Sequence, residues 1–394
     1  MPQHGQGWWM IGLTALLAGC GHAVQPHACT APELPSVARG AVEPDLRGLP
    51  EKLPPLPAPA AYAALTAAEA QCYAVRAVPV AQLLDIKQRA VPDHGKTANL
   101  GSQLLLEAAA EARNKAAGEA LEAFYQLVEA EGRLDLLTLS LNEVRDSLAR
   151  AEELQAKGLR PAAEPVVLRT GVAQLETDEG GVRVAIVQLN GKLRALLAIC
   201  SDAPIWPVAP LQVGPDAGCI DDAVETGLQH RPDIATLRLL SNNLSFHTLT
   251  LTQETLAAVN PGLGPPSPMA QLLLAIVAPG RSLTTVRQQV ATLRAESERQ
   301  AAEEIRTRFR VVEQRLQIVS LMQQKVKLEE QHLAELEEKK AKGINVETDL
   351  GTQRLSVWKA KGDLLHEIVA WEIARVQLRQ AQGLLHRGCD TCRD

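Results

Sequence analysis

Apolar residues recur at alternating spacings of three and four along two long stretches of the chain. The first stretch has a leucine every seventh residue, and the second has apolar residues in the same register 185 positions later. The two sets are Leu127, Leu134, Leu141 and Leu148, and Val312, Val319, Val326 and Leu333. A sustained average spacing of 3.5 residues is typical of coiled-coil helices. Its return at a fixed offset predicts that one long helical hairpin occurs twice.

Each hairpin is predicted to reverse at a glycine. Gly158 and Gly343 follow the last apolar turn of each first arm, where a left-handed residue often ends a helix. Pro161 suits the first turn of the returning helix, so the first reversal is expected at residues 158–161. The predicted long arms are 102–157 and 282–342, and the last returning arm is 347–385.

Shorter helices are predicted ahead of each hairpin. Thr66 and Glu69 form a capping-box pattern that starts a helix running to about residue 90. Residues 221–240 mirror it at an offset of 153, with Pro232 in the place of Pro79. Both segments are therefore expected to belong to the repeats.

Two features of the second hairpin have competing interpretations. Trp371 lies on the apolar seam of the last arm, so we expect it in the core. Arg315 and Glu329 stand where the first hairpin has Ala130 and Val144. They are either solvated or salt-bridged to a neighbouring helix, or they face a water-filled lumen.

Composition supports a helical rod and no enzyme. The chain has 394 residues, 3% aromatic residues and a net charge of −6, with acids and bases interspersed. No basic tract suggests nucleic acid. Gly95-Lys96-Thr97 lacks the first glycine of a phosphate-binding loop, and His366 has no second histidine four positions on. We predict no catalytic residue, no metal site and no cofactor.

The N-terminus resembles a bacterial lipoprotein signal. A short apolar run ends in Leu17-Ala18-Gly19-Cys20, and in such signals the cysteine becomes the lipidated first residue of the mature protein. The resemblance implies lipidation at Cys20. The proline-rich residues that follow, to position 63, are expected to form an extended tether or a strap over the helices.

Export would place the remaining cysteines where disulfides form. Cys200 and Cys219 flank the proline-rich connection between the repeats, so a disulfide between them would clip it. Cys389 and Cys392 are expected to form a local disulfide or to stay as thiols.

With the hairpins placed, the chain resembles the TolC-type outer-membrane efflux proteins. Arg231, Pro232 and Asp233 match the motif that starts the second repeat of that family, and residues 195–197 match its closing Ala-Leu-Leu. Each tip has a glycine followed six positions later by an acid. The resemblance implies that the tips contact an adaptor through Lys157, Gly158, Leu159, Glu164, Lys342, Gly343, Ile344 and Asp349.

The family builds a trimer whose helical hairpins form a periplasmic tunnel and whose strands form a membrane barrel. The resemblance implies a homotrimer that works with a periplasmic adaptor and an inner-membrane pump. The connection between about residues 90 and 102 holds no strand pair, while residues 246–252 and 271–278 leave room for one hairpin. We predict an all-α fold of two tandem antiparallel coiled-coil hairpins, with transmembrane β-strands reduced or absent.

Two functions follow from these expectations. The chain is an efflux or secretion channel protein, lipid-anchored on the periplasmic face of the outer membrane, whose hairpins form the tunnel of a tripartite export system. Alternatively, it is a non-conducting periplasmic scaffold lipoprotein. The expected segments are a signal (1–19), a tether (20–63), a first repeat (64–200), a linker (201–218), a second repeat (219–388) and a tail (389–394).

Overall fold

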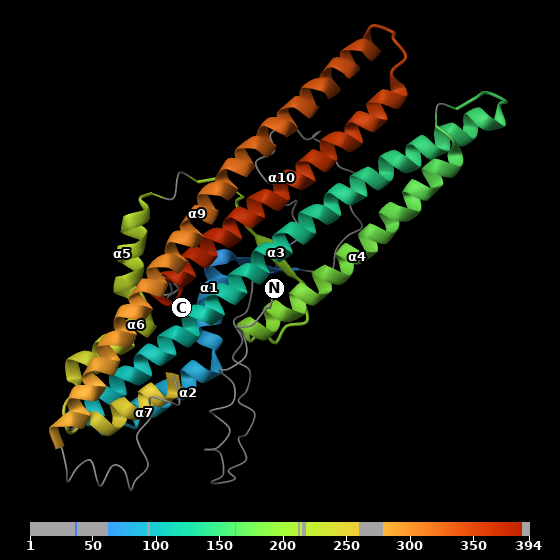
Figure 1. The fold of residues 1–394 in the computed structure, drawn as a ribbon. Coiled ribbons are helices and arrows are strands. Elements are labelled where there is room, and N and C mark those ends of the chain that lie inside the picture. Colours follow the sequence, from blue (N-terminus) through green and yellow to red (C-terminus); the bar gives the residue numbers. More distant parts are fainter. Residues whose placement is uncertain are drawn as a thin grey trace.

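Four long helices form a rod of two hairpins. The computed structural model describes residues 36–37, 62–92, 95–161, 163–211, 213–214, 218–259 and 279–387. The long helices are α3 (Lys96–Ala156), α4 (Pro165–Leu197), α9 (Pro279–Ala341) and α10 (Glu347–Ala381). They lie side by side in the order α9, α10, α3, α4 (Figure 1). The predicted tandem hairpins are confirmed, and α3, at 61 residues, is about 90 Å long.

The apolar seams lie in the core, as their period predicts. Leu127, Leu134 and Leu141 are buried on α3, and Val312, Val319 and Val326 are buried on α9. One large cluster joins the two hairpins. It includes Phe124 and Phe309, which occupy equivalent positions 185 apart, and Trp371, which is 1% exposed. The expectation that Trp371 is a core residue is confirmed.

Short helices surround the ends of the arms opposite the tips. They are α1 (Ala67–Ala77), α2 (Pro79–Arg89), α5 (Ile220–His230), α6 (Pro232–Asn243) and α7 (Leu249–Val259), with a 3-10 turn at Leu385–Arg387 (Figure 1). Thr66 and Glu69 form the predicted capping box. The single helix expected to residue 90 was wrong: it divides at Val78, because the residue before a proline disfavours helical backbone.

Two other expectations about local structure were wrong. Pro161 does not lie in the first turn of the returning helix, since α4 begins at Pro165. Residues 246–252, considered as a strand, form a turn and then the start of α7. A helix fits that segment because Leu249, Leu251 and Leu256 pack beside α6 and the start of α9. Residues 271–278 lie outside the described residues.

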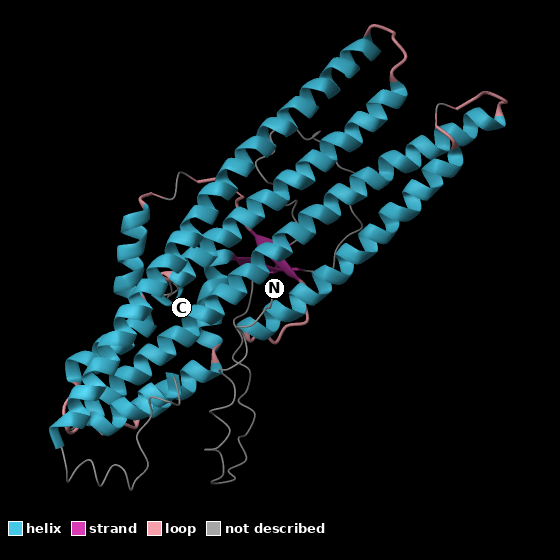
Figure 2. Ribbon diagram, in the orientation of Figure 1, coloured by secondary structure: helices cyan, strands magenta, loops and turns pink. Residues whose placement is uncertain are grey.

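A small sheet, absent from the sequence-based expectations, joins the N-terminal segment to the linker. Its strands are β1 (Ser36–Val37), β2 (Tyr62–Thr66) and β3 (Ile205–Val208), in that order (Figure 2). β1 runs antiparallel to β2, and β3 runs parallel to β2. Tyr62 and Trp206 pack edge to face at 5.9 Å. The sheet therefore ties part of the predicted tether to the connection between the repeats.

The predicted disulfide between Cys200 and Cys219 was wrong. Cys219 has a free thiol, whereas Cys200 is disulfide-bonded. The spacing of cysteines along a sequence does not specify which of them form a disulfide. The linker between Cys200 and Cys219 also contains the strand β3. Cys20, Cys389 and Cys392 lie outside the described residues. In the described part of the chain, no helix combines the length and apolarity needed to cross a membrane.

Four ion pairs recur between the two halves. Their residues on the long helices are 185 positions apart, as in the apolar seams, whereas Asp85 of α2 and Arg238 of α6 are 153 apart. Two pairs keep their signs, and two exchange them. The conserved-sign pairs are Glu152–Arg169 with Glu337–Arg354, and Glu153–Lys157 with Glu338–Lys342; the exchanged pairs are Arg145–Glu176 with Glu330–Lys361, and Asp85–Arg113 with Arg238–Glu298. Three helices of the first repeat therefore have specific counterparts in the second: α2 in α6, α3 in α9 and α4 in α10.

Candidate functional site

Both hairpin tips are built in the same way. In the first, the N–H of Gly158 donates to Gln155 and the N–H of Leu159 donates to Leu154. In the second, Gly343 and Ile344 make the equivalent bonds to Lys340 and Lys339. This pattern of paired bonds requires a left-handed residue, and Gly158 and Gly343 have φ of 70° and 80°. The predicted glycine-based reversals are confirmed.

Each tip presents one apolar side chain beside charged groups. Leu159 is 56% exposed and Ile344 is 52% exposed. Lys157 pairs with Glu153 one turn back, and Lys342 pairs with Glu338 at 2.6 Å. The two tips therefore expose the same arrangement, one apolar side chain beside an ion pair between residues four apart.

The two acids that follow the tip glycines have different positions. Glu164 immediately precedes α4, where its side chain makes no capping bond. Asp349 lies in the first turn of α10, where a carboxylate is favoured by the helix dipole. The structure therefore places both acids at helix starts rather than beside the glycines.

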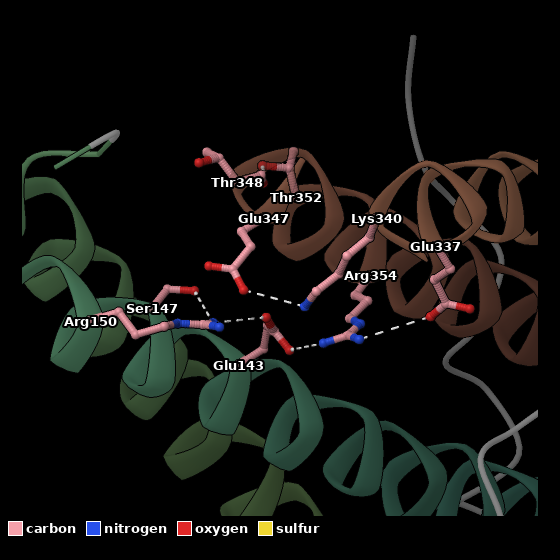
Figure 3. Close-up of polar contacts among 9 residues, drawn as sticks. All are labelled: Glu143, Ser147, Arg150, Glu337, Lys340, Glu347, Thr348, Thr352 and Arg354. Carbon is pink, nitrogen blue, oxygen red and sulfur yellow. Dashed lines mark hydrogen bonds and ion pairs between the residues drawn. The ribbon is translucent and has the colours of Figure 1, made fainter. Parts of the chain in front are cut away.

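Behind the tips, a network of charged groups connects the two hairpins. Glu143 of α3 accepts from Arg354 of α10 at 3.3 Å and lies 3.6 Å from Arg150 (Figure 3). Arg354 also lies 3.9 Å from Glu337 of α9, and Lys340 pairs with Glu347 at 3.3 Å. Glu143 is only 10% exposed at its side chain. It is the one carboxylate in Figure 3 that joins an arm of one hairpin to an arm of the other.

α3 and α10 approach closely at this network. A Cβ added at Gly351 would lie 3.3 Å from Oε1 of Glu143, so the glycine makes room for the carboxylate. A groove of about 170 Å³ lies beside it, bordered by Ser147, Thr348 and Thr352 among others (Figure 3). The hairpins are therefore joined near their tips by charge and by a small residue, and not by a continuous apolar core.

A larger groove of about 910 Å³ runs along α3 between α4 and α10. Its walls carry both charges and apolar side chains, including Trp358 and His366. Nδ1 of His366 lies 2.8 Å from Glu129, and Glu367 accepts from Arg315 at 2.7 Å. The surface of the groove is therefore mainly apolar, with acidic and basic side chains among the apolar ones.

The two second-hairpin charges with competing interpretations both have partners on α10. Arg315 pairs with Glu367, and Glu329 accepts from the amide of Gln353 at 2.7 Å. The salt-bridged interpretation is therefore confirmed for Arg315, and Glu329 is held by a hydrogen bond. Neither side chain is a lone charge on the helix surface.

The predicted repeat-start motif is a structural joint. Arg231 makes two bonds to Asp233, one to Glu304 of α9 at 2.7 Å and one to the carbonyl of Ala381 at 3.0 Å. Burial alone would lower the pKa of Arg231, but the bonds and charges of Asp233 and Glu304 outweigh it and raise that pKa. The motif thus fastens the start of α6 to the interior of α9 and to the end of α10.

A buried acid lies in the core beside Trp371. Glu372 is 8% exposed, and burial raises its pKa. It bonds Arg375, whose guanidinium lies 4.6 Å from the centre of the Trp371 ring. Burial raises the pKa of neighbouring Tyr125 to about 12. No three His, Cys, Asp or Glu side chains within the described ranges come together as metal ligands.

Known structures identify the architecture. No family model matches the chain, and no curated protein matches it in sequence. The solved structure of CusC matches with a TM-score of 0.60 and 14% identity, over 82% of this chain and 96% of CusC. The fold is that of the TolC-type outer-membrane channels.

Other channels of known structure agree with this TolC-type fold. The CmeC outer membrane channel of Campylobacter jejuni matches with a TM-score of 0.54 and 12% identity, over 76% of this chain and 68% of CmeC. The open MtrE outer membrane channel of Neisseria gonorrhoeae matches with a TM-score of 0.52 and 12% identity, over 82% and 91%. The predicted resemblance is confirmed at the level of the fold.

Sequence reasoning identified the tips and missed the network behind them. Glu143 and Arg354 are ordinary charged residues on long helices, and nothing in either hairpin alone distinguishes them. Arg354 does carry a signal, because it repeats Arg169 at the offset of 185. Aligning the charged residues of the two repeats, as well as their apolar residues, would have singled it out.

Proposed function

We propose that this chain is a subunit of an outer-membrane export channel, in which several copies join their hairpins into a periplasmic tunnel. The observation that carries the proposal is the row of four arms, whose fold matches CusC over 96% of that protein. α9 and α4 are the outer members of this row, and each has a long helix on one side only, so closing the row into a tube requires further copies. A homotrimer of twelve arms is the assembly that we propose.

The proposal includes the partners and location expected from the sequence. The tips dock on a periplasmic adaptor of an inner-membrane pump, and lipid on Cys20 anchors the chain to the periplasmic face of the outer membrane. Exposed Leu159 and Ile344 support the docking role of the tips. A photo-crosslinker at either position in native cells should capture an adaptor. The same crosslinker at Phe246, which is 63% exposed but lies near α7 at the opposite end, should not.

The decisive test of transport is electrical. Purified full-length protein reconstituted into planar bilayers should give discrete conductance steps. Absence of conductance from protein that has assembled and inserted would refute the channel role.

A non-conducting periplasmic scaffold is the second candidate. One observation favours it: α2 and α3 are joined by residues 90–95 alone, so the first repeat contributes little beyond helices at that end. A scaffold would keep the assembly and the adaptor contact but would conduct nothing. Conductance and crosslinking, measured on the same preparation, therefore separate the two candidates.

A further inference from the structure

The internal repeat contains one helix-to-helix joint that has no counterpart inside the chain. The joints in the row are α9 with α10, α10 with α3, and α3 with α4 (Figure 1). The first and last are equivalent, since each lies within one hairpin. The middle joint, α10 with α3, connects the two repeats. Because α4 is the counterpart of α10 and α9 is the counterpart of α3, the equivalent contact would bring α4 of one chain against α9 of another chain. These two helices are the outer members of the row.

The outer faces of α4 and α9 carry exposed apolar residues, whereas a helix face in contact with water is usually polar. On α4, valines 166, 167, 184 and 187 are between 58% and 71% exposed, and on α9 Leu321 and Leu328 are 59% and 65% exposed. The counterpart of Val184 on α10 is Val369, 185 positions later, which is fully buried. The same helix face is thus covered in the second repeat and uncovered in the first.

The contacts between α10 and α3 indicate which residues of α4 and α9 would lie opposite one another. At one level, a Cβ added at Gly362 of α10 would lie 3.5 Å from Leu136 of α3. Nearer the tips, Gly351 of α10 lies against the carboxylate of Glu143 of α3. Adding 185 to residues of α3, and subtracting 185 from residues of α10, converts these contacts into Leu321 against Thr177 and Leu328 against Val166. All four of these side chains are exposed in the single chain.

We infer that the outer face of α4 packs on the outer face of α9 of a second copy, in this register, with Leu328 on Val166 and Leu321 on Thr177. The inference rests on the proposed function and goes further by naming the contacts that join the copies. A head-to-tail joint of this kind uses a different surface on each copy, so it closes into a ring when its angle permits.

The short helices at the end opposite the tips also indicate that α9 of a second copy lies beside the first repeat. α6 packs against its own arm, α9, and also against α3 of the other repeat. Its counterpart α2 packs against its own arm, α3, and leaves Val80, Leu83 and Ile86 between 52% and 60% exposed. In the assembly α2 would lie against α9 of the next copy, as α6 lies against α3 within the chain.

The joint between copies differs in chemistry from the joint within a chain. Where Glu143 bonds Arg354, the equivalent positions are Leu328 and Arg169, so an apolar side chain replaces the carboxylate. High salt screens exposed charge pairs and leaves apolar contacts intact. The contact between copies at Leu328 should therefore depend less on salt than the contact between Glu143 and Arg354 within a chain.

Cysteine pairs test the register. In full-length protein carrying Cys219→Ser, the matched pairs are Leu328→Cys with Val166→Cys and Leu321→Cys with Thr177→Cys. The mismatched pairs, Leu328→Cys with Thr177→Cys and Leu321→Cys with Val166→Cys, use the same four positions. Because seven residues of helix span about 10 Å, a short thiol crosslinker should join only the matched pairs between chains. Equal crosslinking of matched and mismatched pairs would overturn the inference.

A second measurement covers the mass of the particle. Leu328→Glu and Val166→Glu lie on exposed faces, so each chain should keep its helical circular dichroism while sedimentation shows a shift to single-chain mass. Phe246→Glu, an exposed apolar position outside the joint, should leave the mass unchanged. If wild-type protein is a single chain, or if the two joint variants keep the wild-type mass, the inference fails.

Conductance tests the transport function, and crosslinking tests the contact between α4 and α9, so the two can fail independently. Matched crosslinks without conductance would keep this joint and remove the channel function. Conductance from a particle that lacks the matched crosslinks would keep the function and remove the joint.

Discussion

The buried ion pair of the second hairpin should contribute more to stability than its exposed counterpart in the first. Nζ of Lys361 lies 2.8 Å from Glu330, and the lysine side chain is 2% exposed while the glutamate is 34% exposed. In the equivalent pair, Arg145 and Glu176 lie 2.6 Å apart and are 50% and 49% exposed. The difference arises because α10 has neighbours on two sides, α9 and α3, whereas α4 has α3 alone as a long neighbour.

The magnitudes follow from these exposures. Glu330→Gln leaves the buried ammonium of Lys361 without a counter-charge. For a fully buried pair this costs about 3–5 kcal/mol, and the partial exposure of Glu330 reduces our expectation to about 1–3 kcal/mol. Arg145→Gln breaks an exposed pair, which is expected to cost about 0.5 kcal/mol or less. Lys361→Met removes the charge itself and should leave stability close to the wild type.

Urea unfolding of the full-length chain, followed by circular dichroism, measures these differences. The comparison is made at one low protein concentration, because assembly would make stability depend on concentration. A change in midpoint at constant slope reports a change in the free energy of unfolding. If Glu330→Gln and Arg145→Gln lower the midpoint equally, the argument from burial is wrong. If Lys361→Met is as damaging as Glu330→Gln, the loss comes from packing and not from an unpaired charge.

Three further predictions use the same unfolding assay. Burial raises the pKa of Glu372, so the folded chain holds that proton more tightly than the unfolded chain; the contribution of this group to stability is greatest in acid and is lost as pH rises through the folded pKa. Glu372→Gln should therefore remove part of the fall in stability as the pH rises above the ordinary carboxyl pKa value of 4.5, and an unchanged pH profile would exclude this cause. Gly383 has φ of 72°, and a Cβ there would lie 2.8 Å from the carbonyl oxygen of His230, so Gly383→Ala should cost more than about 2 kcal/mol. The matched variant Gly158→Ala, with φ of 70° and open space, should cost about 1 kcal/mol, and equal losses would refute the clash. Glu143→Gln should cost about 1 kcal/mol at low salt, with the difference from wild type shrinking as salt is added.

The long helices could be predicted because their apolar period is sustained over many turns. Period alone located the arms, and the tip glycines ended them within a few residues, since only a left-handed residue completes that turn. The capping box at Thr66 could also be predicted from the sequence, because both of its hydrogen bonds join Thr66 to Glu69, three residues away.

Features that depend on distant contacts could not be predicted. β3 contains Pro207, which argues against a strand, and it forms because β2 lies beside it through the fold. Residues 246–252 alternate weakly, and the helix α7 that begins among them is stabilised by apolar side chains of α6 and α9. The charge network behind the tips needs the lateral position of α10 on α3, which no pattern within one hairpin specifies.

The exchanged ion pairs have a consequence for how the chain folds. Two similar hairpins in one polypeptide risk mispairing, because each returning arm resembles the other and could dock on the wrong partner. If α10 took the place of α4 on α3, Lys361 would face Arg145; if α4 took the place of α10 on α9, Glu176 would face Glu330. Asp85 and Glu298 would meet in the same way if α2 docked on α9 in place of α6. Opposite signs in the two halves thus penalise each wrong pairing and favour the native arrangement of the duplicated sequence.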